Sequence, residues 1–224
     1  MKKLLLLLLF TGMISAAQKP NIIFIMVDDM GRDWVSCYGA EHQTPNIDQL
    51  ANQGVLYQTA WCTPICTPTR VTLLTGQYPF HHGWVQHYDV PRWGGAGLRP
   101  DRFITFARLL RESGYATAIG GKWQINHLGQ DPEILKKHGF DEHCVWPGVE
   151  EGKPETVERF WNGLLLTNGK RSKVPYGPDA ICDFLIDYIK RHKYDPFLVY
   201  YPMILTHGTH TTNPMNKARA TEGK

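Results

Sequence analysis

The chain has 224 residues, a formal net charge of +3, 42% hydrophobic residues and 20% charged residues. This composition is ordinary for a globular protein, and the length is sufficient to bury one good core. The basic excess is too small to indicate a nucleic-acid-binding protein, and no block of like charges stands out, so we expect no nucleic acid partner.

The first residues have the layout of a secretory signal peptide. Two lysines follow Met1, residues 4–10 form a continuous apolar run, and residues 15–17 are small, as cleavage sites require. The apolar run is too short to span a bilayer as an ordinary transmembrane helix. We therefore expect residues 1–17 to be removed and the mature chain, starting near Gln18, to be secreted or periplasmic without membrane attachment.

The next segments predict a strand and a short helix. Residues 21–27 form an apolar run with β-branched members, which predicts a fully buried strand of a parallel sheet. The run stops abruptly at Asp28 and Asp29. A short helix is predicted further on, beginning after Thr44 and ending at Gly54.

A second helix is predicted directly after Cys66. Thr67 is suited to cap this helix, Pro68 to its first position and Gly76 to its end. Cys66 would therefore lie just before a helix N-terminus.

The remaining elements complete an alternating pattern. Helices are predicted over residues 104–113 and 178–192, and strands over residues 115–120 and 197–201. Residues 145–178 are rich in glycine, proline and charge, and they predict an excursion over the surface. The order of strands and helices predicts an α/β fold, with a mostly parallel sheet and flanking helices.

Polar side chains follow three of the predicted strands. Asp28 and Asp29 come after the first strand, Lys122 after the second, and His207 lies just past the third. Ligands of such sheets bind beyond the carboxyl ends of the strands. We therefore expect these side chains to gather at one edge of the sheet, although they are far apart in the sequence.

Residues 66–70 read Cys-Thr-Pro-Thr-Arg and match the pattern C-x-P-x-R. The pattern alone arises by chance in roughly one chain in a hundred of this size. Here it begins a predicted helix and follows a buried strand that ends in two aspartates. This context makes chance a poor explanation.

The segment resembles the motif of the sulfatase family, in which a cysteine is converted to formylglycine. The resemblance extends almost to His210 and is carried by KPNIIFIMVDDMG, TPNIDQLANQGVLY, CTPTRVTLLTGQYP, GGKW and YYPMILTH. It implies an alkaline-phosphatase-like α/β fold, bound Ca²⁺ (or Mg²⁺), and hydrolysis of a sulfate ester of a carbohydrate or an aryl alcohol.

The resemblance also implies how the reaction begins. A separate formylglycine-generating enzyme would oxidise the thiol of Cys66 to an aldehyde, and the hydrated aldehyde would attack sulfur. Asp28 and Asp29, together with the modified Cys66, would bind the cation through oxygen.

Further roles follow from the same resemblance. Arg70 would hold the diol or the metal-bound carboxylates, Lys122 would bind the sulfate, and His207 would bind the ester and protonate the leaving oxygen. Many family members have a histidine two residues after the lysine. This chain has Gln124 there and His127 three residues later, so either residue could contact the substrate.

The family also supplies another Asp and an Asn to the metal, and a second Lys to the sulfate, from segments beyond His207. This sequence has no Asp after Asp195, and residues 213–224 form a polar tail without apolar periodicity. We therefore expect residues 18–212 to be the N-terminal part of a sulfatase catalytic domain. We expect the chain to be truncated, and inactive or nearly so by itself.

Two alternatives remain open. A phosphatase or phosphotransferase of the same superfamily would share the fold and the metal, but it would need Ser or Thr in place of Cys66. A non-catalytic remnant that binds metal or a sulfated glycan is favoured by the missing ligands. The identity of the sulfate ester stays open, as does the pairing of the other cysteines, Cys37, Cys62, Cys144 and Cys182.

Overall fold

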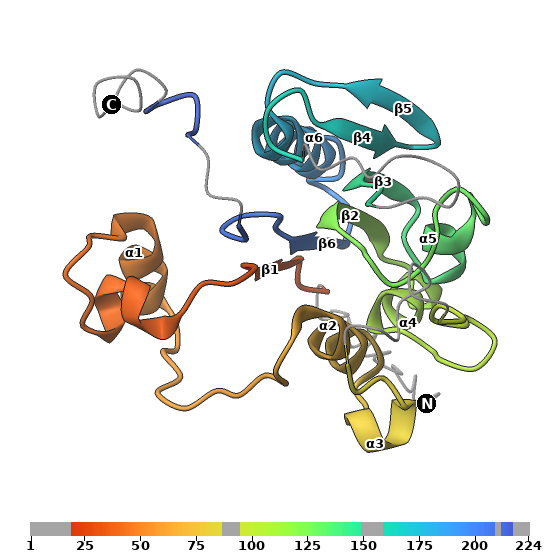
Figure 1. Cartoon of the computed structure of the whole chain (residues 1–224), viewed down its shortest axis with the longest axis horizontal. Coiled ribbons are helices and arrows are strands. Elements are labelled where there is room, and N and C mark those ends of the chain that lie inside the picture. Colours follow the sequence, from red (N-terminus) through yellow and green to blue (C-terminus); the bar gives the residue numbers. More distant parts are fainter. Residues whose placement is uncertain (1–18, 87–94, 149–158, 209–211, 217–224) are drawn as a thin grey trace, which may run out of the picture.

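The computed structural model describes residues 19–86, 95–148, 159–208 and 212–216. Within these ranges a six-stranded sheet has the order β1-β6-β2-β3-β4-β5 (Figure 1). The strands are β1 (Ile22–Met26), β2 (Ala116–Lys122), β3 (Glu142–Trp146), β4 (Leu164–Thr167), β5 (Lys170–Lys173) and β6 (Phe197–Pro202). The expected signal peptide lies outside the described residues, as does most of the expected polar tail.

The helices are α1 (Pro45–Gln53), α2 (Cys66–Thr75), α3 (Pro79–His82), α4 (Phe106–Glu112), α5 (Ile134–Lys137) and α6 (Gly177–Arg191), with short 3₁₀ helices η1 (Arg32–Trp34) and η2 (Ser36–Tyr38). The helices predicted after Thr44 and over residues 104–113 and 178–192 are confirmed as α1, α4 and α6. No helix in the described ranges is long and apolar enough to cross a membrane.

Four neighbouring strands of the sheet are parallel. β1 and β2 both pair with β6 in parallel, and β3 pairs with β2 in the same way. β4 and β5 continue the sheet in antiparallel pairing. The predicted α/β fold with a mostly parallel sheet is therefore confirmed.

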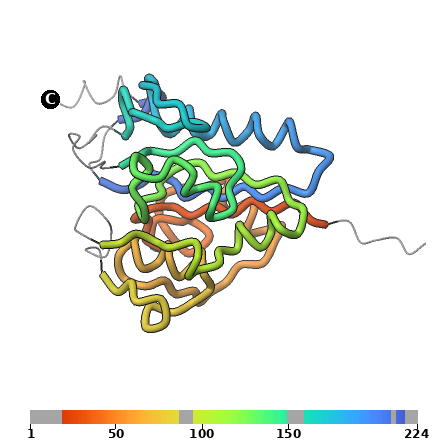
Figure 2. Tube along the Cα trace, turned by 90° about the vertical axis from the view of Figure 1, so that its right-hand side faces the viewer, coloured from red at the N-terminus to blue at the C-terminus, as the bar shows by residue number. Residues whose placement is uncertain are grey.

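Helices cover both faces of the sheet. Because successive side chains of a strand point to opposite faces, Phe197 and Val199 of β6 pack on the side of α6, whereas Leu198 and Tyr200 pack on the side of α2 and α4. In Figure 2, α6 and the orange-to-yellow segment that contains α2 lie on opposite sides of the strands. The core therefore consists of two apolar layers with the sheet between them.

Strand β1 is only half-buried, so the prediction of a fully buried strand is wrong. Ile22 and Phe24 pack against the core. Ile23 and Ile25 point to the other face and are 51% and 50% exposed. The reason is the position of β1 at the end of the strand order, where no described helix covers that face.

Residues 159–178 do not form the predicted surface excursion, because β4 and β5 make a hairpin that extends the sheet. Asn168 and Gly169 form its turn with φ of 45° and 84°. Asn-Gly is the favoured pair for such turns, and Leu165 and Leu166 before it are buried. This hairpin signal was present in the sequence. Residues 149–158, from the same predicted excursion, lie outside the described residues.

Helix α2 begins two residues earlier than predicted, at Cys66 instead of Pro68. Cys66 is its first residue, and Ile65 precedes it as N-cap with a positive φ of 74°. That conformation turns the chain into the helix directly at Cys66, so Thr67 is buried within the first turn and does not act as a cap. The helix ends as predicted at Gly76, whose N–H donates to the carbonyl of Thr72.

Candidate active site

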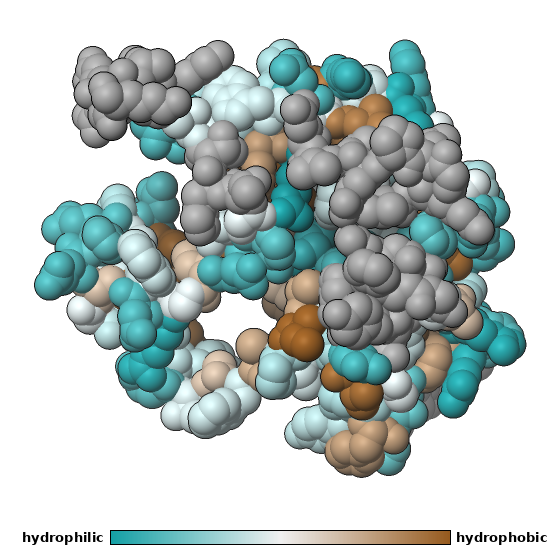
Figure 3. Space-filling model, in the orientation of Figure 1, coloured by the Kyte–Doolittle hydropathy of each residue, from teal (hydrophilic) through white to brown (hydrophobic). Residues whose placement is uncertain are grey.

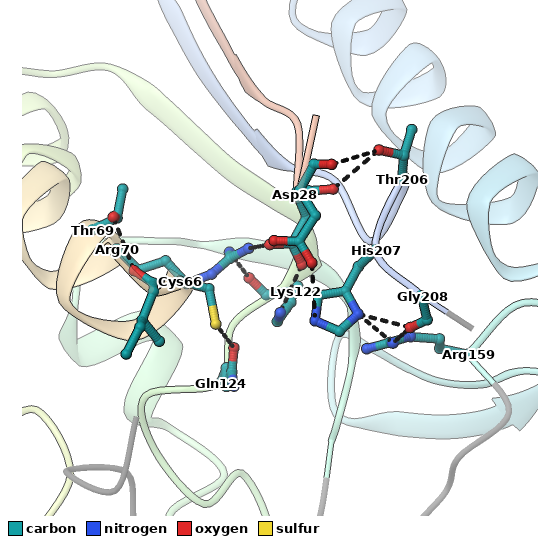
Figure 4. A network of polar contacts seen from close by, with 12 residues as sticks. Asp28, Cys66, Thr69, Arg70, Lys122, Gln124, Arg159, Thr206, His207 and Gly208 are labelled. Carbon is teal, nitrogen blue, oxygen red and sulfur yellow. Dashed lines mark hydrogen bonds and ion pairs between the residues drawn. The ribbon is translucent and has the colours of Figure 1, made fainter. Parts of the chain in front are cut away.

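The segments that follow β1 and β6 lie side by side at the carboxyl edge of the sheet. The N–H of Asp28 donates to the carbonyl of Leu205 at 2.9 Å, and the N–H of Thr206 donates to the carbonyl of Asp28 at 2.8 Å. These bonds connect segments that are far apart in the sequence. The expectation that the polar residues gather at this edge is confirmed (Figure 4).

Asp28, Cys66, Arg70 and Lys122 form what we call the inner cluster. Lys122 is the last residue of β2, and its Nζ donates to Oδ2 of Asp28 at 2.6 Å. Arg70 Nη2 is 3.5 Å from Oδ1 of the same carboxylate, and Arg70 Nη1 donates to the carbonyl of Lys122 at 2.7 Å. The three charged side chains are at most 4% exposed. One buried carboxylate therefore lies between two cations.

The pKa of Lys122 is lower than that of an ordinary lysine. Burial is the main cause, and repulsion from Arg70 acts in the same direction, whereas Asp28 and Cys66 oppose it. A lysine with a lowered pKa gives up its proton more readily. A buried group perturbed in this way beside a pocket is typical of a functional site.

Cys66 contacts Gln124 and also lines a pocket. Its Sγ lies 3.4 Å from Oε1 of Gln124, and it is not in a disulfide. A cavity of about 400 Å³ is lined by Asp28, Asp29, Cys66 and Arg70 among others. Figure 3 shows the molecule hollowed between the segment around α1 and the body that carries α2. Because Cys66 begins a ten-residue helix, the helix dipole favours negative charge there.

Asp29, His207 and Arg159 form a second group, which we call the outer cluster. His207 Nε2 is 3.5 Å from Oδ2 of Asp29, and the two side chains are 33% and 62% exposed. Nη2 of Arg159 is 2.7 Å from Nδ1 of His207 and also contacts the carbonyl of Gly208. Its guanidinium stacks on Trp146 at 5.1 Å. Sequence reasoning did not find Arg159, because it lies outside every motif.

Of the two candidates after Lys122, Gln124 contacts Cys66, whereas the hydrogen bonds of His127 described below are made by its backbone. Gln124 has a positive φ of 68°, and its side chain reaches Cys66. The carbonyl of His127 accepts hydrogen bonds from the N–H groups of Gln130 and Asp131. The structure thus brings Gln124 to the inner cluster, and the role of His127 in binding substrate stays a prediction.

The side chains of Asp28 and Asp29 have the chemistry of ligands for a divalent cation. Both are carboxylates that line the pocket, and oxygen ligands are those that Ca²⁺ and Mg²⁺ prefer. Within the described part of the chain, no three His, Cys, Asp or Glu residues form a group that could hold a metal ion. Further ligands would have to be carbonyl oxygens, water or residues outside the described ranges.

A mostly parallel six-stranded sheet with flanking helices, which carries a cysteine and charged side chains near its carboxyl edge, is the alkaline-phosphatase-like fold. The family model for sulfatase matches residues 20–224. The chain therefore belongs to the sulfatase family, whose members use a divalent metal and a formylglycine.

Known proteins similar to this chain are sulfatases. Human N-acetylgalactosamine-6-sulfatase is 32% identical over 88% of this chain and 41% of its own length. Human steryl-sulfatase is 44% identical over 74% of this chain and 27% of its own length. A structure solved with its substrate D-glucosamine-2-N,6-O-disulfate has a TM-score of 0.73 at 28% identity, over 92% of this chain and 38% of that one. The chain spans less than half the length of each of these proteins.

Proposed function

We propose that these residues form the nucleophile-bearing part of a sulfatase active site that hydrolyses sulfate esters. The observation that carries the proposal is the placement of Cys66. It is the cysteine of a C-x-P-x-R motif, it begins α2, and it opens into a pocket shared with Asp28, Asp29 and Arg70. The partner this requires is a formylglycine-generating enzyme that acts on Cys66.

Conversion of Cys66 to formylglycine would supply a hydrated aldehyde, with one hydroxyl to attack sulfur and a second that allows sulfate to leave. The N-terminus of α2 would favour the negative charge that develops there. Gln124 faces the same position at 3.4 Å from the sulfur, so its side chain could orient the hydroxyl groups.

The inner cluster has the charge needed to bind a sulfate. Arg70 and Lys122 contribute two positive charges against the single carboxylate of Asp28, and all three are buried. Hydrogen-bond donors that are already fixed in a site stabilise a developing anion more than mobile ones in water. We therefore propose that Arg70 holds the hydrated aldehyde or the carboxylates that bind the metal, and that Lys122 binds the sulfate oxygens.

Release of the alcohol requires a proton. We propose that His207 gives this proton, a role supported by its partial exposure and by the 3.5 Å distance between its Nε2 and Oδ2 of Asp29, which lines the pocket. Overall, one water is consumed, and the alcohol and sulfate are released.

We propose that Asp28 and Asp29 would hold the divalent cation, with Ca²⁺ preferred and Mg²⁺ possible. A bound cation would supply positive charge that lowers the pKa of the hydrated aldehyde and neutralises sulfate oxygens. We also propose that residues 1–17 direct the protein to the periplasm or the exterior.

A sulfated carbohydrate is the proposed substrate class. One similar structure was solved with D-glucosamine-2-N,6-O-disulfate, and another with a neocarrahexaose. These ligands support a sugar sulfate for this chain as well, although they belong to the other proteins.

The test is sulfate release by the protein isolated from its native source, where a formylglycine-generating enzyme can act on Cys66, because we expect these 224 residues by themselves to be inactive or nearly so. We expect turnover of 4-nitrophenyl sulfate and of a sugar sulfate, and a loss of at least about a thousandfold in kcat for Cys66→Ala. Cys37→Ala serves as the matched control, because Cys37 is a free cysteine outside the pocket lining, and it should keep the rate.

Three outcomes would contradict the proposal. Unchanged turnover by Cys66→Ala would exclude this nucleophile. Faster turnover of 4-nitrophenyl phosphate than of the sulfate would indicate a phosphatase. Thermal stabilisation by Ca²⁺ without turnover of either ester would indicate a binding protein.

A further inference from the structure

A second cavity adjoins the active-site pocket. Its volume is about 540 Å³, which is in the usual range for a small-molecule site. The lining comes from two segments, within residues 30–38 and 57–61, which precede and follow α1 in the orange part of Figure 1. Met30 and Gly31 also line the active-site pocket. Because the two cavities share part of their wall, a ligand that fills the first can extend into the second.

Side-chain contacts join the two segments of this wall. Nη1 of Arg32 donates to the carbonyl of Gln58 at 3.2 Å, and the hydroxyl of Tyr38 donates to the carbonyl of Tyr57 at 2.9 Å. The guanidinium of Arg32 also lies over the ring of Tyr38, at 4.9 Å from its centroid. These contacts hold the segments against each other and define the shape of the second cavity.

Aromatic rings of the wall are open to solvent. Tyr57 is 70% exposed and Trp61 is 90% exposed, and both line the second cavity together with Tyr38. Such rings gain free energy when a ligand covers their apolar faces, whereas the Tyr hydroxyl and the Trp N–H can stay in contact with water. The flat face of a ring also matches the C–H face of a pyranose. The wall therefore has the chemistry of a sugar-binding surface.

The charge of the cavity is positive. Among the described residues that line it, only Arg32 is charged. The guanidinium is exposed, and it forms no ion pair with another residue of the part of the chain that the structure describes. A guanidinium carries five N–H donors in a planar arrangement that fits two oxygens of a carboxylate or a sulfate. The complementary ligand is therefore a sugar with a negative charge.

We propose that the second cavity binds an anionic sugar of the substrate, next to the sugar whose sulfate is cleaved. Trp61 and Tyr57 would contact its ring, and Arg32 would bind its sulfate or carboxylate. The substrate would then be a sulfated oligosaccharide or polysaccharide instead of a single sugar. The role in catalysis rests on the proposed function, whereas binding in the second cavity requires no turnover.

The direct test is calorimetric titration of the 224-residue chain produced without a formylglycine-generating enzyme, so that no sulfate is released. The probes are a chondroitin 6-sulfate tetrasaccharide and the single sugar N-acetylgalactosamine 6-sulfate. We expect the tetrasaccharide to bind at least about 10-fold more tightly. Trp61→Ala and Arg32→Gln should each weaken tetrasaccharide binding about 10-fold and leave the single sugar unaffected. Trp61→Phe keeps an aromatic face and should stay within about threefold of the unmodified chain.

Tyr194→Ala and Arg102→Gln are the matched controls. Tyr194 is an 86% exposed ring outside the cavity lining. Arg102 is an exposed arginine that likewise lies over an aromatic ring, at 5.1 Å from the centroid of Phe103. Both variants should keep the tetrasaccharide affinity of the unmodified chain. Circular dichroism checks that every variant is folded.

A further probe distinguishes the two sources of negative charge. A sulfated neocarratetraose has sulfate groups and no carboxylate, whereas the chondroitin tetrasaccharide has both. If Arg32→Gln weakens the binding of both tetrasaccharides, Arg32 accepts a sulfate. If it weakens only the binding of the chondroitin tetrasaccharide, Arg32 selects the carboxylate. Either result supports an anionic sugar in the second cavity.

Equal affinity of the unmodified chain for the single sugar and both tetrasaccharides would overturn the proposal, even if a variant failed to fold. Unchanged binding of both tetrasaccharides by folded Trp61→Ala and Arg32→Gln would also overturn it.

The two proposals can fail separately. Turnover of the single sugar by protein from the native source, without a preference for either tetrasaccharide, would refute the second cavity and leave the proposed function. Tetrasaccharide binding that depends on Trp61 and Arg32, without turnover of any sulfate ester by that protein, would refute the proposed function and leave the second cavity as a site for an anionic sugar.

Discussion

The inner and outer clusters lie beside each other but are built differently. Asp28, Arg70 and Lys122 of the inner cluster are buried and are held by strand ends and a helix. Asp29 and His207 of the outer cluster are partly exposed and come from loops that follow strands. The comparison shows that the buried charges are fixed by regular elements, whereas the more exposed pair depends on loops.

The largest effect on stability should follow from breaking the inner cluster. Asp28→Asn would leave Lys122 and Arg70 buried without a counter-charge, and we expect the free energy of unfolding to fall by about 3–5 kcal/mol. Urea unfolding followed by circular dichroism measures this change. A loss below about 1 kcal/mol would mean that the three charges are not as buried or as coupled as the geometry indicates.

The backbone beneath Lys122 offers a second way to break the inner cluster. Gly121 has a φ of 126°, and a Cβ at this position would lie 1.9 Å from the carbonyl oxygen of Pro202 on β6. Gly121→Ala should therefore force β2 and β6 apart and cost about 3 kcal/mol or more. Gly76→Ala is the matched control for a positive φ without a clash, since nothing lies within 4 Å there. Equal losses for the two variants would refute the steric explanation.

The packing around Trp123, the residue that follows Lys122, should be sensitive to acid. Burial lowers the pKa of His138, which contacts the ring of Trp123, to about 4. The unfolded chain binds a proton at His138 below about pH 6.5, whereas the folded chain resists it until about pH 4. Stability should thus fall as the pH drops through this window, by about 3 kcal/mol from this residue.

The free energy of unfolding measured by urea at several pH values between 4 and 7 checks this expectation. His138→Gln should flatten the profile across that window. A variant with the same slope as the unmodified protein would place the responsible group elsewhere.

The smallest effect should come from the outer cluster. Asp29 is 62% exposed and its contact with His207 is long, at 3.5 Å. We therefore expect Asp29→Asn to change the free energy of unfolding by less than about 1 kcal/mol. The same urea experiment as for Asp28→Asn gives the comparison. A loss as large as that of Asp28→Asn would remove the distinction between the two clusters.

The inner cluster could be predicted because strong local signals carry it. Asp28 and Lys122 occur where apolar strands end, and Arg70 lies within a motif on a helix. Only part of the outer cluster could be predicted from the sequence. His207 was found from its position after a strand, but Arg159 reaches it through a fold-level contact that no local pattern records.

The burial of strand β1 and the first residue of helix α2 could not be predicted from the sequence either. The exposed face of β1 depends on where the strand lies in the sheet, which the apolar run of residues 21–27 does not reveal. The first residue of α2 depends on the positive φ of Ile65, which is unusual for a β-branched residue. The β4–β5 hairpin, by contrast, could have been predicted from Asn168-Gly169.

The central claim is that Cys66 is the precursor of the nucleophile. Its most direct test is the mass of the proteolytic peptide that contains Cys66, taken from protein produced together with a formylglycine-generating enzyme. We predict the mass of an aldehyde at this position and a thiol at Cys62 in the same peptide map. An unmodified thiol at Cys66, in cells where a reference sulfatase is converted, would contradict the account.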